Sequence, residues 1–80
     1  MPTITLQLFA SLQQYLPPGT RGRQTPHDVR DGATTGEVLR ALGVPRESAH
    51  LIMVNGTHAE WDAPLAEGDI LSAFPPVAGG

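Results

Sequence analysis

The opening segment of the chain constrains the fold most, because its two sides have opposite character. In the segment from Thr3 to Phe9, the apolar side chains of Ile4, Leu6 and Leu8 alternate with the polar ones of Thr3, Thr5 and Gln7. A period of two predicts a β-strand with one buried face. Such a strand needs neighbouring strands and a second layer over its apolar side. The rest of the chain must therefore supply both.

A helical pattern farther along the chain supplies the covering layer. Thr34 and Glu37 have the spacing of a capping box. In that motif Thr34 accepts a hydrogen bond from the amide of residue 37, and the Glu37 side chain reaches back to the helix start. Three apolar residues follow on one helical face: Val38, Leu39 and Leu42. Gly43 is placed for a left-handed cap at the helix end.

The segments between this strand and this helix are predicted to be short or peripheral. After Ala10, apolar residues recur at three- and four-residue steps, which predicts a short helix that ends at Pro17-Pro18-Gly19. Residues 20–30 are polar and contain Pro26. Because proline cannot donate to a central ladder, a strand here must lie at a sheet edge.

The second half of the chain predicts three more strands. Leu51-Ile52-Met53-Val54 is a continuous apolar run, which predicts a strand buried on both faces. Asn55-Gly56 predicts a two-residue hairpin turn into a short return strand. Ile70 to Phe74 predicts a last strand. The whole order favours an α+β domain, residues 1–74, with one helix across a mixed four- or five-stranded sheet. Residues 75–80 should form an extended tail, because Pro75-Pro76 fits neither helix nor ladder.

The composition excludes several classes of function. A chain of 80 residues has little room for a deep enzyme pocket. It has no cysteine, which excludes disulfides and thiolate metal sites, and its three histidines lack metal-ligand spacing. A net charge of −3 without a basic stripe argues against nucleic-acid binding. There is no signal-peptide pattern and no apolar run near the ~20 residues of a membrane span, so we expect a cytoplasmic protein without a membrane partner.

The end of the chain, Gly79-Gly80, is the strongest candidate for a functional device. Glycine has no Cβ, so a glycine pair can thread through a narrow channel. A terminal carboxylate, with a reference pKa of about 3.5, is ionised at neutral pH and can attack an activated phosphate. A non-functional chain end is the alternative interpretation of the same two residues.

An apolar stretch next to that end is a candidate partner surface. Phe74, Pro75, Pro76 and Val77 are consecutive, and exposed apolar surface beside a reactive terminus suits a docking enzyme. Phe74 could equally belong to the core, and Trp61 is ambiguous between packing and interface.

Several of these motifs together resemble the MoaD/ThiS family of ubiquitin-like sulfur carriers. The likeness is most specific from Leu65 through the Gly68-Asp69 turn to the closing Phe-Pro-Pro-Val-Ala-Gly-Gly, a form similar to the small subunit of molybdopterin synthase. The start of the short helix at Phe9 and the Asn55-Gly56 hairpin also fall where that family has them. The likeness is loose between Gly19 and Pro45.

The resemblance implies a β-grasp fold and a role in sulfur transfer. In that family an adenylyltransferase resembling the ubiquitin-activating enzyme uses ATP to adenylate the terminal carboxylate. A persulfide on a sulfurtransferase or cysteine desulfurase then replaces AMP and leaves a thiocarboxylate. Gly80 would bear the sulfur and Gly79 would give access. The implied partner contacts are Phe74, Pro75, Pro76, Val77 and Ala78.

On this reading the chain binds no cofactor or metal and does not catalyse alone, but supplies sulfur to a larger acceptor subunit. The favoured pathway is molybdopterin biosynthesis, with thiamine or cysteine biosynthesis as alternatives. Two other functions stay open: a protein modifier that forms isopeptide bonds through the same activated glycine, and an adaptor in which the tail has no chemical role.

Overall fold

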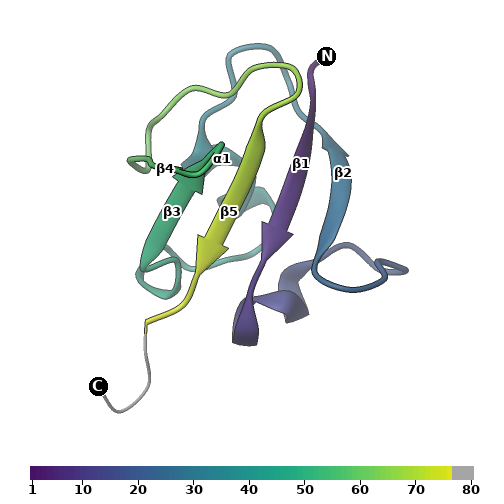
Figure 1. Ribbon diagram of the computed structural model, residues 1–80, viewed down its shortest axis with the longest axis vertical. Helices are drawn as coiled ribbons and strands as arrows, with labels where there is room; N and C mark the ends of the chain where they lie inside the picture. The colour runs from purple at the N-terminus through teal and green to yellow at the C-terminus, as the bar shows by residue number, and fades with distance from the viewer. Residues whose placement is uncertain (77–80) are drawn as a thin grey trace.

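The structure, a computed structural model, describes residues 1–76 and places five strands in one mixed sheet (Figure 1). The strands are β1 (Thr3–Leu8), β2 (Gln24–Asp28), β3 (Leu51–Val54), β4 (Thr57–His58) and β5 (Ile70–Phe74). Their order across the sheet is β2-β1-β5-β3-β4. The central pair β1 and β5 is parallel, and every other pair is antiparallel. The α+β prediction of a mixed four- or five-stranded sheet is confirmed.

One face of the sheet is covered by helix α1 (Thr35–Ala41), which lies behind the strands in Figure 1. Two short 3-10 helices, η1 (Ala10–Tyr15) and η2 (Arg46–Ser48), complete the elements. The alternation of the opening segment is realised, because Ile4, Leu6 and Leu8 are at most 1% exposed. The core between sheet and helix also contains Leu12, Val38, Leu39, Ile52, Leu71 and Ala73.

Both ends of α1 use backbone chemistry that the sequence indicated. The Thr34 hydroxyl accepts a hydrogen bond from the Glu37 amide at 3.2 Å. At the other end Gly43 has φ of +91°, its amide donates to Arg40, and the next amide, of Val44, donates to Leu39. These two bonds make a Schellman cap, which requires a left-handed residue where glycine stands.

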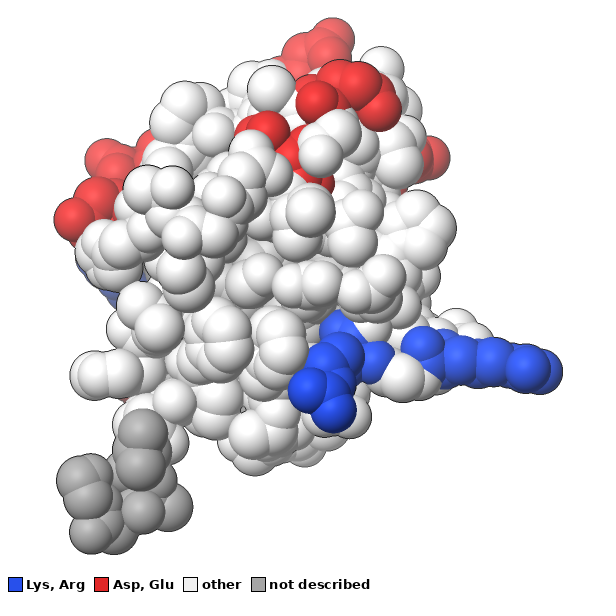
Figure 2. Space-filling view, in the orientation of Figure 1, with Lys and Arg blue, Asp and Glu red and all other residues white. Residues whose placement is uncertain are grey.

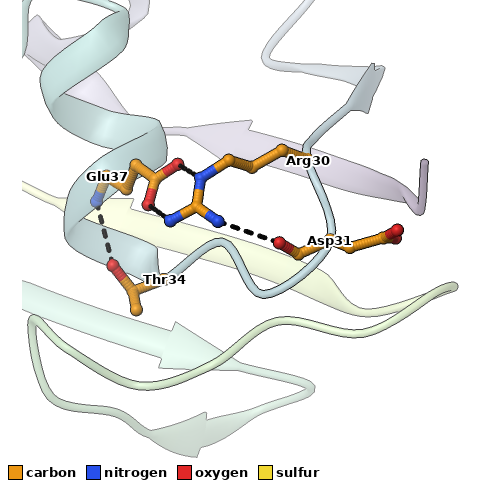
Figure 3. A network of polar contacts seen from close by, with 4 residues as sticks. All are labelled: Arg30, Asp31, Thr34 and Glu37. Atoms are coloured by element: carbon orange, nitrogen blue, oxygen red, sulfur yellow. Dashed lines mark hydrogen bonds and ion pairs between the residues drawn. The ribbon is translucent and has the colours of Figure 1, made fainter.

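The second half of the predicted capping box is wrong. The Glu37 carboxylate does not return to the helix start but accepts hydrogen bonds from the Arg30 guanidinium, which also donates to the Asp31 carbonyl at 2.9 Å (Figure 3). Hydrogen bonding to Glu37 and its negative charge raise the pKa of Arg30. A charged bidentate partner is a stronger competitor for the carboxylate than a single amide. The pair thereby ties the segment after β2 to the first turn of α1.

Pro26 lies in β2 at the edge of the sheet, as predicted. The hydrogen bonds from Leu8 to Arg23 and from Val29 to Pro2 set the ladder, so the alternate residues Gln24, Pro26 and Asp28 turn their backbone groups outward. The missing N–H of Pro26 therefore costs no bond to β1. It also leaves the free edge less able to pair with another chain.

The prediction that β3 is buried on both faces is wrong. Ile52 is 5% exposed and faces the core, whereas Leu51 is 36% exposed and Met53 and Val54 are half-buried. The reason is that α1 covers only one side of the sheet. An apolar run in the sequence could not reveal that the opposite face has no covering layer.

Trp61 packs against α1, which resolves its ambiguous role. Its carbonyl accepts a hydrogen bond from the Gly36 amide at 2.6 Å, and the neighbouring Thr35 hydroxyl bonds the same carbonyl at 2.8 Å. A Cβ placed on Gly36 would overlap the Trp61 ring. The loop that carries Trp61 is therefore held directly on the first turn of the helix, and only glycine fits at this contact.

Candidate functional site

A groove of about 570 Å³ opens at the end of the sheet where β1 and β5 finish. Its lining is mostly apolar and consists of Phe9, Ala10, Ser11, His50, Leu51, Phe74, Pro75 and Pro76. Among residues 1–76 no carboxylate lines it, and His50 is the one titratable side chain of that lining. The centre of the groove is a pair of stacked rings, Phe9 and Phe74, with centroids 4.3 Å apart and planes 10° from parallel.

Strand register brings these two rings together across most of the chain length. Leu8 pairs with Ala73 in the parallel ladder, and both are fully buried. The next residues, Phe9 and Phe74, therefore turn to the opposite face of the sheet. The Phe9 amide extends the ladder by donating to the Ala73 carbonyl at 3.2 Å. On the other side of β5, Leu51 pairs with Phe74 and adds a third apolar side chain.

The residue after Phe9 has an unusual backbone conformation. Ala10 has φ of +52°, in the left-handed region that residues with a Cβ seldom occupy. This turn sends the chain directly from β1 into η1, where Leu12 enters the core. Phe9 is thereby left as the last residue on the outer face.

The rest of the outer face divides into an apolar and a polar part. Ile70 is 39% exposed and Leu51 36%, while Met53 is half-buried beside them. Toward β2 the surface becomes polar: the Ser72 hydroxyl donates to Gln7 and the Gln7 amide donates to Gln24, each at 2.8 Å. This uncovered face leads from the sheet centre into the groove.

The structure places the predicted partner residues as follows. Phe74 and Pro75 are half-buried in the groove and Pro76 is exposed at its margin. Phe74 is thus neither a full core residue nor a free one. The other candidates, Val77, Ala78, Gly79 and Gly80, lie outside the described residues. Sequence reasoning missed Phe9 and Leu51, since only the register shows that they meet Phe74.

Other kinds of site find no support in the described part of the chain. Among residues 1–76 no group of three acidic, histidine or cysteine side chains is placed to hold a metal ion. No helix in this part is long and apolar enough to cross a membrane. What residues 1–76 contain is an apolar groove that includes Phe74, Pro75 and Pro76.

The mixed sheet, the single covering helix and the uncovered apolar face define a ubiquitin-like β-grasp protein. The chain belongs to the Mut7-C ubiquitin family, whose family model matches residues 1–79. The predicted β-grasp fold and the resemblance to the MoaD/ThiS group of ubiquitin-like proteins are thereby confirmed.

Solved structures agree with this assignment. The crystal structure of SAMP1 from Haloferax volcanii is 32% identical, with a TM-score of 0.69 over 98% of this chain and 99% of that one. A putative molybdopterin converting factor subunit 1 from Pyrococcus furiosus has the same fold at 21% identity and TM-score 0.69, over 96% and 100% of the two chains. The structure of the complex of subunits 1 and 2 of molybdopterin-converting factor from Helicobacter pylori contains a chain with this fold. Its sequence identity is 19% and its TM-score 0.58, over 98% of this chain and 99% of that one. No curated protein shows a significant similarity to the chain.

Proposed function

We propose that the protein is a ubiquitin-like sulfur carrier whose reactive group is the carboxylate of Gly80. The observation that carries the proposal is the apolar groove at the base of the diglycine tail. Phe74 and Pro75 line it, and five more residues follow Pro75, the last of which is Gly80. A partner that binds at the groove can thereby place the last two glycines in its own active site.

The chemistry proceeds in three steps. A carboxylate oxygen of Gly80 attacks the α-phosphate of ATP on an adenylyltransferase, and pyrophosphate leaves. The outer sulfur of a persulfide then attacks the carbonyl carbon, and AMP leaves. A second thiol then attacks the donor's cysteine sulfur, forms a disulfide with it, and the thiocarboxylate leaves. Gly79 next to this carbon offers no side chain to obstruct either attack. The chain needs no thiol of its own, in keeping with the absence of cysteine.

Binding energy from the groove is needed because each residue whose backbone becomes fixed in a partner's active site costs about 1–2 kcal/mol. Glycine contacts alone return little of this. Burial of the Phe9, Leu51 and Phe74 surface at about 25 cal/mol per Å² offsets part of it. The groove and the tail therefore act as one recognition element.

The proposal implies three protein partners and no bound cofactor. They are a ubiquitin-activating-enzyme-like adenylyltransferase, a sulfurtransferase or cysteine desulfurase, and an acceptor enzyme such as a molybdopterin synthase large subunit. Molybdopterin synthesis is the favoured destination because of the closing Phe-Pro-Pro-Val-Ala-Gly-Gly sequence. The chain shares its fold with subunit 1 of molybdopterin-converting factor, and in one structure that subunit is bound to subunit 2. This likeness supports the choice. Thiamine and cysteine synthesis are the alternative destinations.

A second candidate function is protein modification, in which a lysine amine attacks the activated glycine. The similarity to the small archaeal modifier protein 1 of Haloferax volcanii, at 30% identity and TM-score 0.71, favours it. Both functions begin with the same acyl-adenylate. They differ in whether the sulfur of a persulfide or the amine of a lysine attacks its carbonyl carbon.

Deletion of Gly80 is expected to abolish ATP–pyrophosphate exchange by the adenylyltransferase of the same genome, because Ala78-Gly79 would end one residue short of the nucleotide. Exchange of radiolabelled pyrophosphate into ATP measures this step. The matched control extends the chain by one alanine after Gly80, which should also block exchange without touching the fold. Full exchange by the shortened chain would leave the tail without a chemical role and favour the adaptor interpretation.

Phe74→Ala is expected to weaken binding to the adenylyltransferase about tenfold or more, as for an aromatic anchor in an interface. Its stability cost should stay near 1–2 kcal/mol, since the half-buried ring loses one stacking partner. Isothermal titration and thermal unfolding measure the two effects. Ile70→Ala is the matched control, since Ile70 lies on the same strand and face but at the far end from the groove. Unchanged affinity with lost stability would assign Phe74 to the core.

A further inference from the structure

Two arginines precede β2 at the end of the sheet where the groove lies, and neither pairs with a carboxylate within residues 1–76. Arg21 and Arg23 lie in the loop that leads into β2, and the Arg23 carbonyl accepts a hydrogen bond from the Leu8 amide at the end of β1. Within residues 1–76 the ion pairs involve Met1 and Arg30, and neither Arg21 nor Arg23 takes part in one. Their positive charge at this end is therefore not neutralised by the described part of the chain.

Much of the negative charge is concentrated at the opposite end of the sheet. The carboxylates there end or follow β2 or precede β5, and they are Asp28, Asp31, Glu67 and Asp69. Figure 2 shows this separation, with acidic side chains in the upper part of the view and the two prominent basic groups in the lower part. A protein with net charge −3 thus presents a locally basic end.

The Arg23 side chain lies over a ring that lines the groove. Its guanidinium carbon lies 5.5 Å from the centre of the Phe9 ring, whose other face stacks on Phe74. A guanidinium attracted to a ring face is oriented without using its N–H donors. No hydrogen bond from the Arg23 side chain is found within residues 1–76. An oriented cation with its donors unused is suited to binding a carboxylate from outside.

We propose that Arg23, with Arg21 two residues before it in the same loop, binds carboxylates of the partner protein and sets the orientation in which the groove is engaged. The partner surface then has an apolar side chain for the groove and acidic residues toward the β2 side of it. This inference rests on the proposed function, because the partners are the enzymes that activate or receive the tail. A polyanionic nucleic acid fits less well, since the groove is lined by phenylalanine, leucine and proline and the net charge is negative.

The main effect of this separation of charge is on the orientation in which the partner binds. An acidic partner surface is attracted to the arginine end and repelled by the carboxylate end. Charges at an interface margin act chiefly on the association rate and its salt dependence. At about 0.1 M salt the screening length is about 10 Å, so the attraction extends across the groove but not across the molecule.

The test measures binding of the chain, without ATP, to the adenylyltransferase and to the candidate acceptor subunit of the same genome. We expect Arg23→Glu to weaken affinity for at least one of them about tenfold at low salt, mainly through the association rate. Arg23→Lys should keep most of the affinity. Arg40→Glu makes the same charge change on the exposed side of α1, behind the sheet, and should change affinity less than about twofold. At about 1 M salt, where the screening length is about 3 Å, the Arg23→Glu difference should disappear. Thermal unfolding of each variant confirms that the fold is intact.

Three outcomes overturn the inference: equal effects of Arg23→Glu and Arg40→Glu, no binding to either enzyme, or tight binding of a single-stranded RNA that Arg23→Glu removes. The inference and the proposed function can fail separately. Charge-dependent binding without formation of a thiocarboxylate supports the inference and contradicts the sulfur-carrier role. Formation of a thiocarboxylate, together with binding that is insensitive to Arg23, supports the sulfur-carrier role and contradicts the inference.

Discussion

Replacing Gly36 by alanine is expected to lower the free energy of unfolding by about 1–3 kcal/mol, the range for an extra methyl group in a tightly packed site. The prediction is informative because helix propensity alone has the opposite sign, favouring alanine over glycine within a helix by about 0.5–1 kcal/mol. Gly36 is buried in the first turn of α1, and an added Cβ would overlap the Trp61 ring. Steric overlap should therefore outweigh propensity.

A double-mutant cycle assigns the Gly36 effect to its cause. In a Trp61→Leu background the ring is gone, so Gly36→Ala should be neutral or stabilising there. Thermal or urea unfolding of the four proteins gives the coupling free energy directly. For a domain of this size, 1 kcal/mol corresponds to about 4–8 °C in Tm, so the effect is easily measured. A destabilisation that persists in the Trp61→Leu background would mean that the close approach of helix and loop backbones, and not the ring, excludes alanine.

Leu6→Ala is expected to cost about 2–5 kcal/mol, as for other fully buried leucines. Leu6 is 0% exposed in the central strand β1. An 80-residue domain has a total stability of about 4–12 kcal/mol, so much of the protein would unfold at moderate urea concentration. Urea unfolding measures the change.

Leu51→Ala is the matched control for Leu6→Ala, because the same side chain is removed from the uncovered face of the same sheet. Leu51 is 36% exposed, so the loss should be below about 1.5 kcal/mol. Binding to the adenylyltransferase should fall instead, since Leu51 lines the groove. Equal stability losses at the two positions would show that the outer face is covered in solution.

The elements that depend on local pattern could be predicted from the sequence. Alternation identified β1, the Thr34 cap and Gly43 identified α1, and Asn55-Gly56 identified the hairpin, where both residues have positive φ. Pro26 identified an edge strand. Each of these signals is contained within a few residues, so no knowledge of tertiary packing is needed to interpret it.

The elements that depend on distant partners could not be predicted. The exposure of Leu51 follows from the absence of a second layer, which an apolar run does not encode. The capping-box pattern predicts that the Glu37 side chain bonds to the start of its own helix. The sequence does not show that Arg30, seven residues earlier, comes within reach of that side chain. The stacking of Phe9 on Phe74 requires the parallel register of two strands at opposite ends of the chain. The chemistry of the tail stays a prediction, and of the groove at its base the sequence indicates Phe74, Pro75 and Pro76 but not Phe9 or Leu51.

The most direct test of the sulfur-carrier account is the intact mass of the chain after incubation with ATP, a persulfide donor and the adenylyltransferase of the same genome. The account predicts a gain of about 16 Da, from one oxygen replaced by sulfur at Gly80, and no gain in a Gly80-deleted control. If the enzyme forms AMP but the chain keeps its original mass, no thiocarboxylate is made. That result would contradict the account and leave protein modification as the function to test, by a search for isopeptide-linked targets.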